Sequence, residues 1–493
     1  MTSICSLSAP NFNPLRKRSG ARLLALSIVA TVVLAAYTLS AATIAEYTVT
    51  NSGSSRDEVG TLNWAVFTAN YYGADVNYIR FNIPDVAEQA VITLSEELFI
   101  ARLMVIDGKS QPGYKETPKI CIDANGLNGA FLLVGNVANI PPTSSGGVST
   151  SSGSTIQGFQ IVNYKSNGIT IFKESQGNWI QENWIGFKRE SGSKKYWHNA
   201  KVHPYSRGIG LQSSFNTIRQ NTISGVDNAI TIGEAIEDTW SGDYYLTNAI
   251  ERNFIGTDPT GSHKIGNASD GIFLGAGAKE NFLGPGNVIS GNASSGVELL
   301  HHTNYGNIII GSIIGLNAEG TAAIPNDELG VLIAGGATFN DVGGPSGGNI
   351  IAGNTLGGVC IGMGIFPGPD GTNGNYVEFN LIGTDGTGKK IIPGQGTAVT
   401  VGTNSRGNVV RGNVLVGSTY HGVTIDHAKG NGIYDNWIGA TADGTALTNG
   451  GYGVYLQDAP NNFIMGNTFG GNSLGNMGFY GNSSDNAISN NGG

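Results

Sequence analysis

The sequence is short of charge, of cysteine and of long apolar runs. Only 13% of its 493 residues are charged, and Asp and Glu outnumber Lys and Arg by 36 to 27. This balance argues against a nucleic-acid-binding protein, which needs a basic face. With three cysteines, disulfides cannot be the main source of stability. Beyond residue 45 no apolar run is long enough to cross a bilayer as a helix.

Helical periodicity is also missing from most of the chain. In residues 248–292, asparagines recur five or six residues apart, and short apolar pairs between them end at glycine. No apolar stripe follows the i, i+3, i+4 spacing of an amphipathic helix. The segments are too short for a self-sufficient sheet, so each must stack on a copy of itself. This pattern predicts a solenoid.

The copies share a glycine or alanine followed by alternating apolar residues, which marks one strand in each turn. These strands begin at Gly168, Gly208, Ala229, Gly271, Gly296, Gly330, Gly358, Gly396, Gly422, Gly453 and Gly478. Three short strands and three turns per coil predict an all-β fold, a single-stranded parallel β-helix of about 10–13 coils. Inward Ile, Val and Leu would stack about 4.8 Å apart. Asparagines held in register would form amide ladders.

The first 150 residues differ in kind from the repeats. A basic stretch, the uncharged run 23–39 and the small residues 40–42 are typical of an export signal. We expect residues 1–45 to be a signal peptide or, if uncleaved, a signal anchor and the chain's only membrane segment. Residues 46–150 should hold an N-terminal cap, with a helix over 60–70, and the first coils. Residues 151–493 should form the regular β-helix.

Several motifs of this chain resemble those of large exported bacterial right-handed β-helix repeat proteins. They are T-V-T-N-S-G from Thr48, the helix segment from Gly60, I-D-G-K-S-Q-P-G-Y from Ile106, and the repeats G-N-V-I-S-G-N and N-x-I-G-T-D-x-x-G. Asn63 stands where the group usually has arginine. The resemblance implies right-handed coils and a secreted or cell-surface location, and it carries no activity.

The chemistry must lie among outward side chains, two residues after each strand-opening glycine. That row is predicted to be Thr170, Gly210, Thr231, Phe273, Glu298, Leu332, Cys360, Ala398, Thr424 and Tyr455. A β-helix polysaccharide lyase would need clustered carboxylates and a basic residue on such a face. Glu298 is the only ionisable group in the row, and the motifs typical of polygalacturonase-like hydrolases are missing. Both observations argue against the best-known β-helix enzymes.

One candidate site combines Asp426 and His427, which follow one strand, with Asp458, which follows the next. One coil step brings such groups to about 5 Å. A carboxylate, an imidazole and a second carboxylate suit acid/base catalysis or cation binding. The alternative is that these polar residues merely cap strand ends. His301 and His302 lie four coils earlier and cannot join this cluster.

Two loops carry further candidates. The first mixes carboxylates with aromatic rings, as a sugar-binding cleft does, and would bind substrate through Glu234, Glu237, Asp238, Trp240, Asp243 and Tyr244. The second is basic and aromatic, from Lys188 to His203, and suits an acidic polysaccharide. For both segments a solvated surface loop is the favoured alternative.

No metal site or cofactor is predicted. Asp258 and Asp385 sit in T-D turns similar to calcium-binding repeats, but Asx turns explain them without an ion. Two functions remain open. The first is an exported scaffold, adhesive or binding polysaccharide or matrix. The second is an extracellular carbohydrate-active enzyme, a lyase, epimerase or hydrolase. The uniform, charge-poor repeat favours the scaffold.

Overall fold

The computed structural model describes residues 42–135, 149–189, 196–198, 205–233, 242–363 and 371–493. Residues 44–493 form one compact unit, and 1–43 are a separate one. Most of the expected signal segment therefore lies outside the described residues. Among those residues, no helix has the length and apolar character that crossing a membrane requires.

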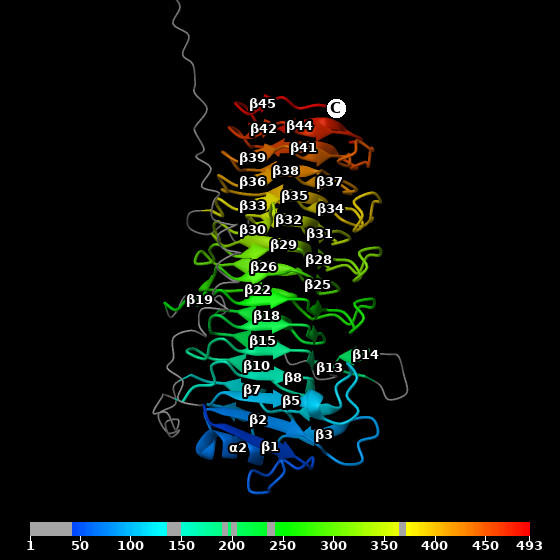
Figure 1. Cartoon of the computed structure of the whole chain (residues 1–493). Coiled ribbons are helices and arrows are strands. Elements are labelled where there is room, and N and C mark those ends of the chain that lie inside the picture. The colour runs from blue at the N-terminus through cyan, green and yellow to red at the C-terminus, as the bar shows by residue number, and fades with distance from the viewer. Residues whose placement is uncertain (1–41, 136–148, 190–195, 199–204, 234–241, 364–370) are drawn as a thin grey trace, which may run out of the picture. The chain divides into compact units, whose positions relative to one another are not determined.

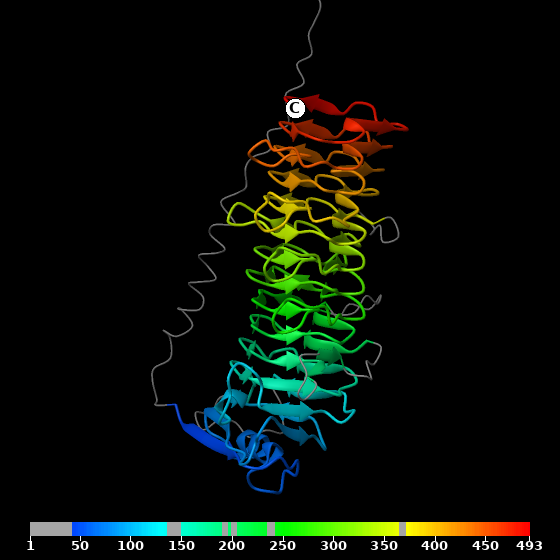
Figure 2. The ribbon, with the colours of Figure 1, turned by 90° about the vertical axis from the view of Figure 1, so that its right-hand side faces the viewer.

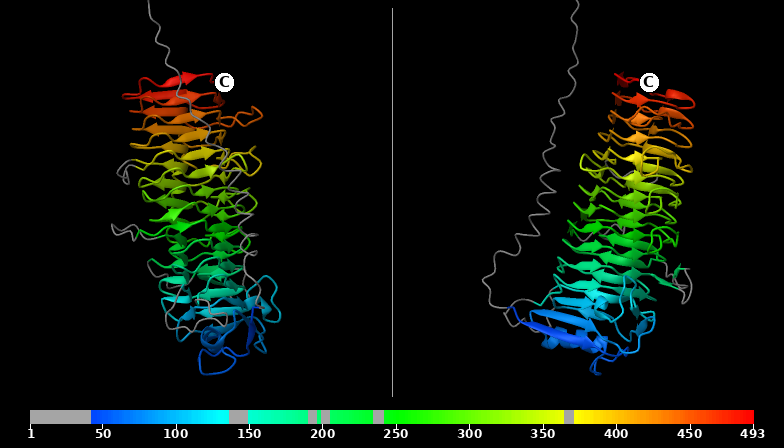
Figure 3. Two further views of the ribbon diagram at one scale, coloured as in Figure 1. Left: turned by 60° about the vertical axis from the view of Figure 1, so that its left-hand side comes forward. Right: turned by 45° about the vertical axis from the view of Figure 1, so that its right-hand side comes forward.

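Three long parallel sheets make up the unit 44–493, with 15, 13 and 13 strands among the described residues. The chain visits each sheet once per coil: β10 (Asn167–Ile171) belongs to the second sheet, β11 (Trp179–Gln181) to the first and β12 (Trp184–Ile185) to the third. Each strand of these three sheets pairs with its equivalent in the next coil, and Figures 1, 2 and 3 show the stacked coils. This is the predicted right-handed parallel β-helix.

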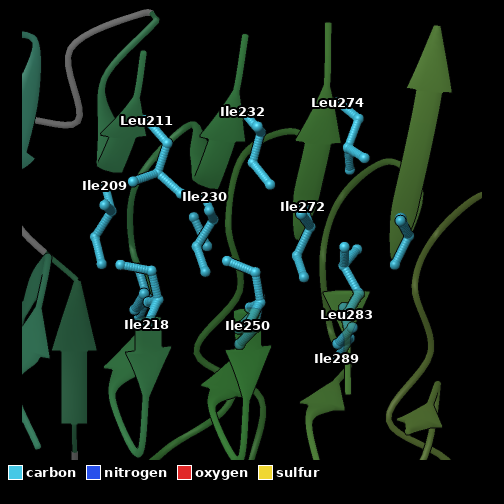
Figure 4. Packing of buried hydrophobic residues seen from close by; sticks show 14 of the residues in the cluster. Ile209, Leu211, Ile218, Ile230, Ile232, Ile250, Ile272, Leu274, Leu283 and Ile289 are labelled. Atoms are coloured by element: carbon cyan, nitrogen blue, oxygen red, sulfur yellow. The ribbon is translucent and has the colours of Figure 1, made fainter. Parts of the chain in front are cut away.

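The pairing register stacks identical positions on one another. In the second sheet β10 pairs with β15 (Arg207–Leu211), β15 with β18 (Asn228–Ile232) and β18 with β22 (Ile272–Leu274), so that Ile169, Ile209, Ile230 and Ile272 form one column. Figure 4 shows these columns facing Ile218 and Ile250 of the first sheet. All are fully buried. Burying each such side chain contributes roughly 1.5–3 kcal/mol, so the core is a sum of many equal layers.

Asparagine ladders run along the corners between sheets, as the sequence predicted. In one of them, the backbone N–H of each asparagine donates to the side-chain oxygen of the next coil's asparagine. The members are Asn178, Asn216, Asn248, Asn281, Asn307, Asn340, Asn375, Asn408, Asn431, Asn462 and Asn486. The ladder satisfies backbone donors that the turns leave without strand partners.

The predicted helix is α2 (Leu62–Tyr72), which packs at the N-terminal end of the unit against β1 (Ile44–Val49) and β4 (Leu98–Ile100). Thr61 caps the helix, because its hydroxyl accepts a hydrogen bond from the Trp64 N–H at 3.1 Å. Its buried face carries Leu62, Ala65, Val66 and Ala69, the residues that the apolar spacing selects. The helix covers the core that an open solenoid end would expose.

One position of the predicted outward row is wrong. In the second sheet β32 (Gly357–Ile361) pairs with β35 (Thr397–Val401) so that Cys360 lies beside Thr400. Ala398 therefore occupies the strand-opening position, where most coils have glycine, and is fully buried. The glycine that the sequence offered, Gly396, belongs to the preceding turn. Cys121 and Cys360 are both buried and free, as expected from their separation.

Candidate functional site

The structure brings Asp426, His427 and Asp458 together. They follow β38 (Val423–Asp426) and β41 (Tyr452–Gln457), two adjacent strands of the second sheet. His427 Nδ1 lies 2.6 Å from Asp426 Oδ1, and Nε2 lies 3.6 Å from Asp458 Oδ2. The imidazole thus stands between two carboxylates of successive coils. All three side chains remain partly open to solvent, with His427 51% and Asp458 35% exposed.

Backbone geometry explains why polar residues occupy this corner. His427 and Asp458 both adopt a left-handed backbone, with φ of 49° and 45°, and Asn404 holds the same corner one coil earlier with φ of 61°. Asn, Asp and His tolerate this conformation better than most residues. Asp458 Oδ1 also accepts the N–H of Asn482 at 2.8 Å. The corner requires polar residues, and the contacts to His427 are additional to that requirement.

The two carboxylates hold His427 toward its protonated form. The hydrogen bond and charge of Asp426, and to a lesser extent the charge of Asp458, raise the pKa of His427 above its usual value. A raised folded-state pKa means that the interaction stabilises the fold at acidic pH and is lost as pH rises through that pKa.

We expect NMR titration of the imidazole signals to show the pKa of His427 above 6.5. Asp426→Asn should lower the midpoint more than Asp458→Asn, because Asp426 makes the larger contribution. His421 gives an internal comparison, since burial lowers its pKa. A midpoint for His427 below that of His421 would show that the cluster does not form in solution.

An aromatic stack involves Tyr452 and Tyr455 of β41 and His421, which lies just before β38. The rings of His421, Tyr452 and Tyr455 are nearly parallel, with 9–20° between planes and centroids 4.7–5.9 Å apart. His421 Nδ1 accepts the Tyr452 backbone N–H at 2.9 Å, which fixes the ring and requires that nitrogen to be unprotonated. Tyr455 belongs to the outward row and pairs in register with Gly478 of the last coil. No side chain of that coil covers it at this position.

Two glycines make room for this stack. A Cβ at Gly451 would collide with His421 Nδ1, and one at Gly478 would lie 2.5 Å from the Tyr452 ring. Stacked rings give a flat apolar surface, and the neighbouring carboxylates and imidazole supply hydrogen-bonding groups. This pairing of ring faces with polar groups suits a sugar. We call the six residues Asp426, His427, Asp458, His421, Tyr452 and Tyr455 the outer-face cluster.

The acidic, aromatic loop can be followed only in part. Glu234, Glu237, Asp238 and Trp240 lie outside the described residues. Asp243 forms an ion pair with Lys173 at 2.9 Å, and the Lys279 ammonium lies 5.2 Å from the centre of the Tyr244 ring. The binding role of this loop stays a prediction.

The basic loop is also described only in part, and its binding role stays a prediction. Lys188 belongs to β13 (Phe187–Arg189), which pairs antiparallel with β14 (Tyr196–His198). The Lys188 ammonium lies 3.5 Å from the Asp123 carboxylate. Residues 190–195 and 199–204 lie outside the described ranges. Asp258 accepts hydrogen bonds from Thr260, Ser262 and His263 within its own turn. These are the contacts of the Asx turn that the sequence favoured.

The sequence analysis did not predict a buried pair of carboxyl groups, Asp270 and Glu298. Burial, followed by the charge of Asp270 and a hydrogen bond to it, raises the pKa of Glu298. Burial likewise raises the pKa of Asp270, which accepts the Ser295 N–H at 3.0 Å. Phe273 and Leu332 flank Glu298 in the outward row. The single ionisable group of that row is therefore held toward its neutral form.

Comparisons with known proteins support the fold. The family described as periplasmic copper-binding protein (NosD) matches residues 389–492, a minor part of the chain that contains the outer-face cluster. No curated protein matches the sequence. The catalytic unit of an α-1,3-glucanase from Streptomyces thermodiastaticus is 11% identical with a TM-score of 0.51, covering 93% of this chain and 70% of its own.

Two further structures match with TM-scores below 0.5. The A-module of mannuronan C-5 epimerase AlgE4 from Azotobacter vinelandii has a TM-score of 0.45 at 13% identity, covering 90% of this chain and 100% of its own. Tailspike protein 3 of bacteriophage CBA120 has a TM-score of 0.48 at 12% identity, covering 91% and 61%. At such identities the likeness concerns the fold alone.

The copper in the NosD description can be tested against the residues present. Residues 389–492 contain two histidines and no cysteine. One ring nitrogen of His421 accepts a hydrogen bond from a backbone N–H, and His427 is flanked by carboxylates. Within the described ranges no three His, Cys, Asp or Glu side chains converge to hold a metal ion.

Proposed function

We propose that this protein is an exported β-helix scaffold that binds a polysaccharide along the outer face of its second sheet. The observation that carries the proposal is the outer-face cluster. On two adjacent coils it combines stacked rings with two carboxylates and an imidazole at the ends of the same two strands. Tyr455 supplies a ring face for the apolar side of a sugar, while Asp426 and Asp458 accept hydrogen bonds from its hydroxyl groups.

Export is part of the proposal. The N-terminal sequence has the basic, apolar and small-residue regions of a signal. The partial match to a family described as periplasmic agrees with it. The N-terminal residue of the mature protein, determined after expression in a bacterial host, tests this point: a start near residue 43 supports cleavage, and an intact Met1 supports an anchor.

Replacing Tyr455 with alanine should weaken polysaccharide binding about tenfold, because one stacked ring contributes roughly 0.5–1.5 kcal/mol beyond its buried area. Affinity electrophoresis in gels containing polygalacturonate, xylan or dextran measures the effect. Tyr72→Ala is the matched control, since Tyr72 is 78% exposed on α2, far along the stack from this cluster. Equal binding by both variants would contradict the proposal.

The alternative is a carbohydrate-active enzyme. It is favoured by one specific observation, the His427 imidazole held between carboxylates of two coils, an arrangement suited to proton transfer. Incubation with the same polysaccharides should then yield new reducing ends or unsaturated products, and Asp426→Asn should abolish them. Binding without turnover supports the scaffold.

A further inference from the structure

A second polar pocket lies on the outer face of the second sheet, near its N-terminal end. It has a volume of about 340 Å³ and is lined by residues of β7 (Gly129–Leu133), β10, β15 and β18. The floor is open because Gly210 stands in register between Thr170 and Thr231. A Cβ at Gly210 would approach the Asn167 amide to 2.8 Å. The missing side chain thus creates the pocket.

Three polar atoms around this pocket are buried and have no hydrogen-bond partner within the described part of the chain. They are the Thr231 hydroxyl, the Asn167 side-chain oxygen and Arg207 Nε. Thr231 is only 2% exposed. Leaving a buried polar group unpaired typically costs about 1–3 kcal/mol, so native folds keep such groups rare. Within the described ranges, the three together make this cavity a place where a bound ligand would find ready hydrogen-bond partners.

Arg207 interrupts a row of small polar residues. The residues that directly precede the strand-opening glycine or alanine in neighbouring coils are Asn167, Asn228, Asp270 and Ser295. The guanidinium forms no ion pair within 4.0 Å of a carboxylate among the described residues, although the charge of Asp227 acts on it from farther away. Its desolvation is therefore only partly offset. An anion in the pocket would complete the arrangement.

The residues that line the pocket also restrict which kind of anion can bind there. Glu97 also lines the pocket, with its Oε1 accepting the Gly129 N–H at 3.1 Å. Its negative charge disfavours a phosphate or sulfate dianion beside Arg207. The Asn167 oxygen and the Glu97 carboxylate accept hydrogen bonds, so the ligand must also carry donors. A carboxylate with neighbouring hydroxyl groups meets both requirements.

We infer that this Arg207 pocket binds a uronate unit, with the sugar carboxylate on Arg207 and Thr231 and its hydroxyls on Asn167 and Glu97. That the uronate is part of a polysaccharide rests on the proposed function. Thr231 and Thr424 are separated by six coil steps in register, about 29 Å. A short oligosaccharide therefore occupies this pocket or the outer-face cluster, but not both.

The test uses the full mature chain and two matched probes, a trimer of galacturonate and its neutral carboxyl-reduced counterpart, with calorimetry or saturation-transfer NMR. We expect the acidic trimer to bind at least tenfold more tightly than the neutral one. Arg207→Gln should abolish that preference. Arg406→Gln, which makes the same change at an exposed arginine in a distant coil, should leave it intact.

Thr231→Val separates binding from folding. It keeps the shape but removes a hydroxyl that has no partner, so the melting temperature should hold or rise while affinity for the acidic trimer falls at least threefold. Equal binding of the two trimers, or no loss in Arg207→Gln, would overturn the inference. Loss of trimer binding in Tyr455→Ala alone would overturn it and leave the proposed function standing. If the trimer binds to the pocket but Tyr455→Ala leaves the affinity for polysaccharide unchanged, the proposed function is rejected instead.

Discussion

Asn307→Ala should lower the free energy of unfolding by about 4 kcal/mol, because it removes one fully buried step of the asparagine ladder. Its side-chain oxygen accepts the Asn281 N–H and amide at 3.0 Å, and its own amide donates to the Asn340 side chain and the Ala278 carbonyl. Truncation leaves several fully buried groups without partners, each costing about 1–3 kcal/mol. Urea unfolding followed by circular dichroism measures the loss.

The matched control is Asn482→Ala. Asn482 is exposed, and its side chain accepts only the Ser484 hydroxyl within the last coil. We expect a change within about 0.5 kcal/mol, as for other surface substitutions. A loss below about 1 kcal/mol for Asn307→Ala, or equal losses for both variants, would show that the ladder does not stabilise the coils.

Gly383→Ala should cost at least about 3 kcal/mol, because two effects add. Gly383 has φ of 91°, a conformation that disfavours any Cβ, and the added carbon would collide with the backbone oxygen of Val416 in the next coil. Gly256 and Gly315 face backbone oxygens in the same way. These are the glycines of the extra turn that lengthens alternate coils. Thermal and urea unfolding both report the change.

Gly444→Ala isolates the conformational part of that cost. Gly444 has φ of 85°, but a Cβ there would meet nothing within 4 Å. We expect a loss of about 1 kcal/mol from the backbone conformation alone. If Gly444→Ala destabilised as much as Gly383→Ala, close packing between coils would not be what fixes the glycines of the long turns.

The repeat made the fold predictable. Apolar residues recur with the same phase in each coil, and asparagine and glycine recur at the corners, so the sheets, the ladders and the α2 cap followed from spacing alone. The error at Ala398 has a physical cause. Alanine can take the place of the strand-opening glycine, and the neighbouring Gly396 then shifts the expected register by two residues.

The sequence predicted only those site residues that lie at matching positions after adjacent strands. Asp426, His427 and Asp458 lie at matching offsets of adjacent coils, and the structure places them within contact distance. His421 and Tyr452 were missed because their rings stack across a turn, in space that Gly451 and Gly478 leave empty. Arg207 did leave a signal, as a charged residue in a row of small polar ones, but the cavity beside it depends on three-dimensional packing.

The central claim is that the outer face of the second sheet is the polysaccharide-binding surface. Hydroxyl-radical footprinting, with and without polygalacturonate, tests it most directly. The account predicts that Tyr452 and Tyr455 become protected, while Tyr376 of β33 (Tyr376–Glu378) in the first sheet keeps its reactivity. Protection of Tyr376 with no change at Tyr452 and Tyr455 would contradict it.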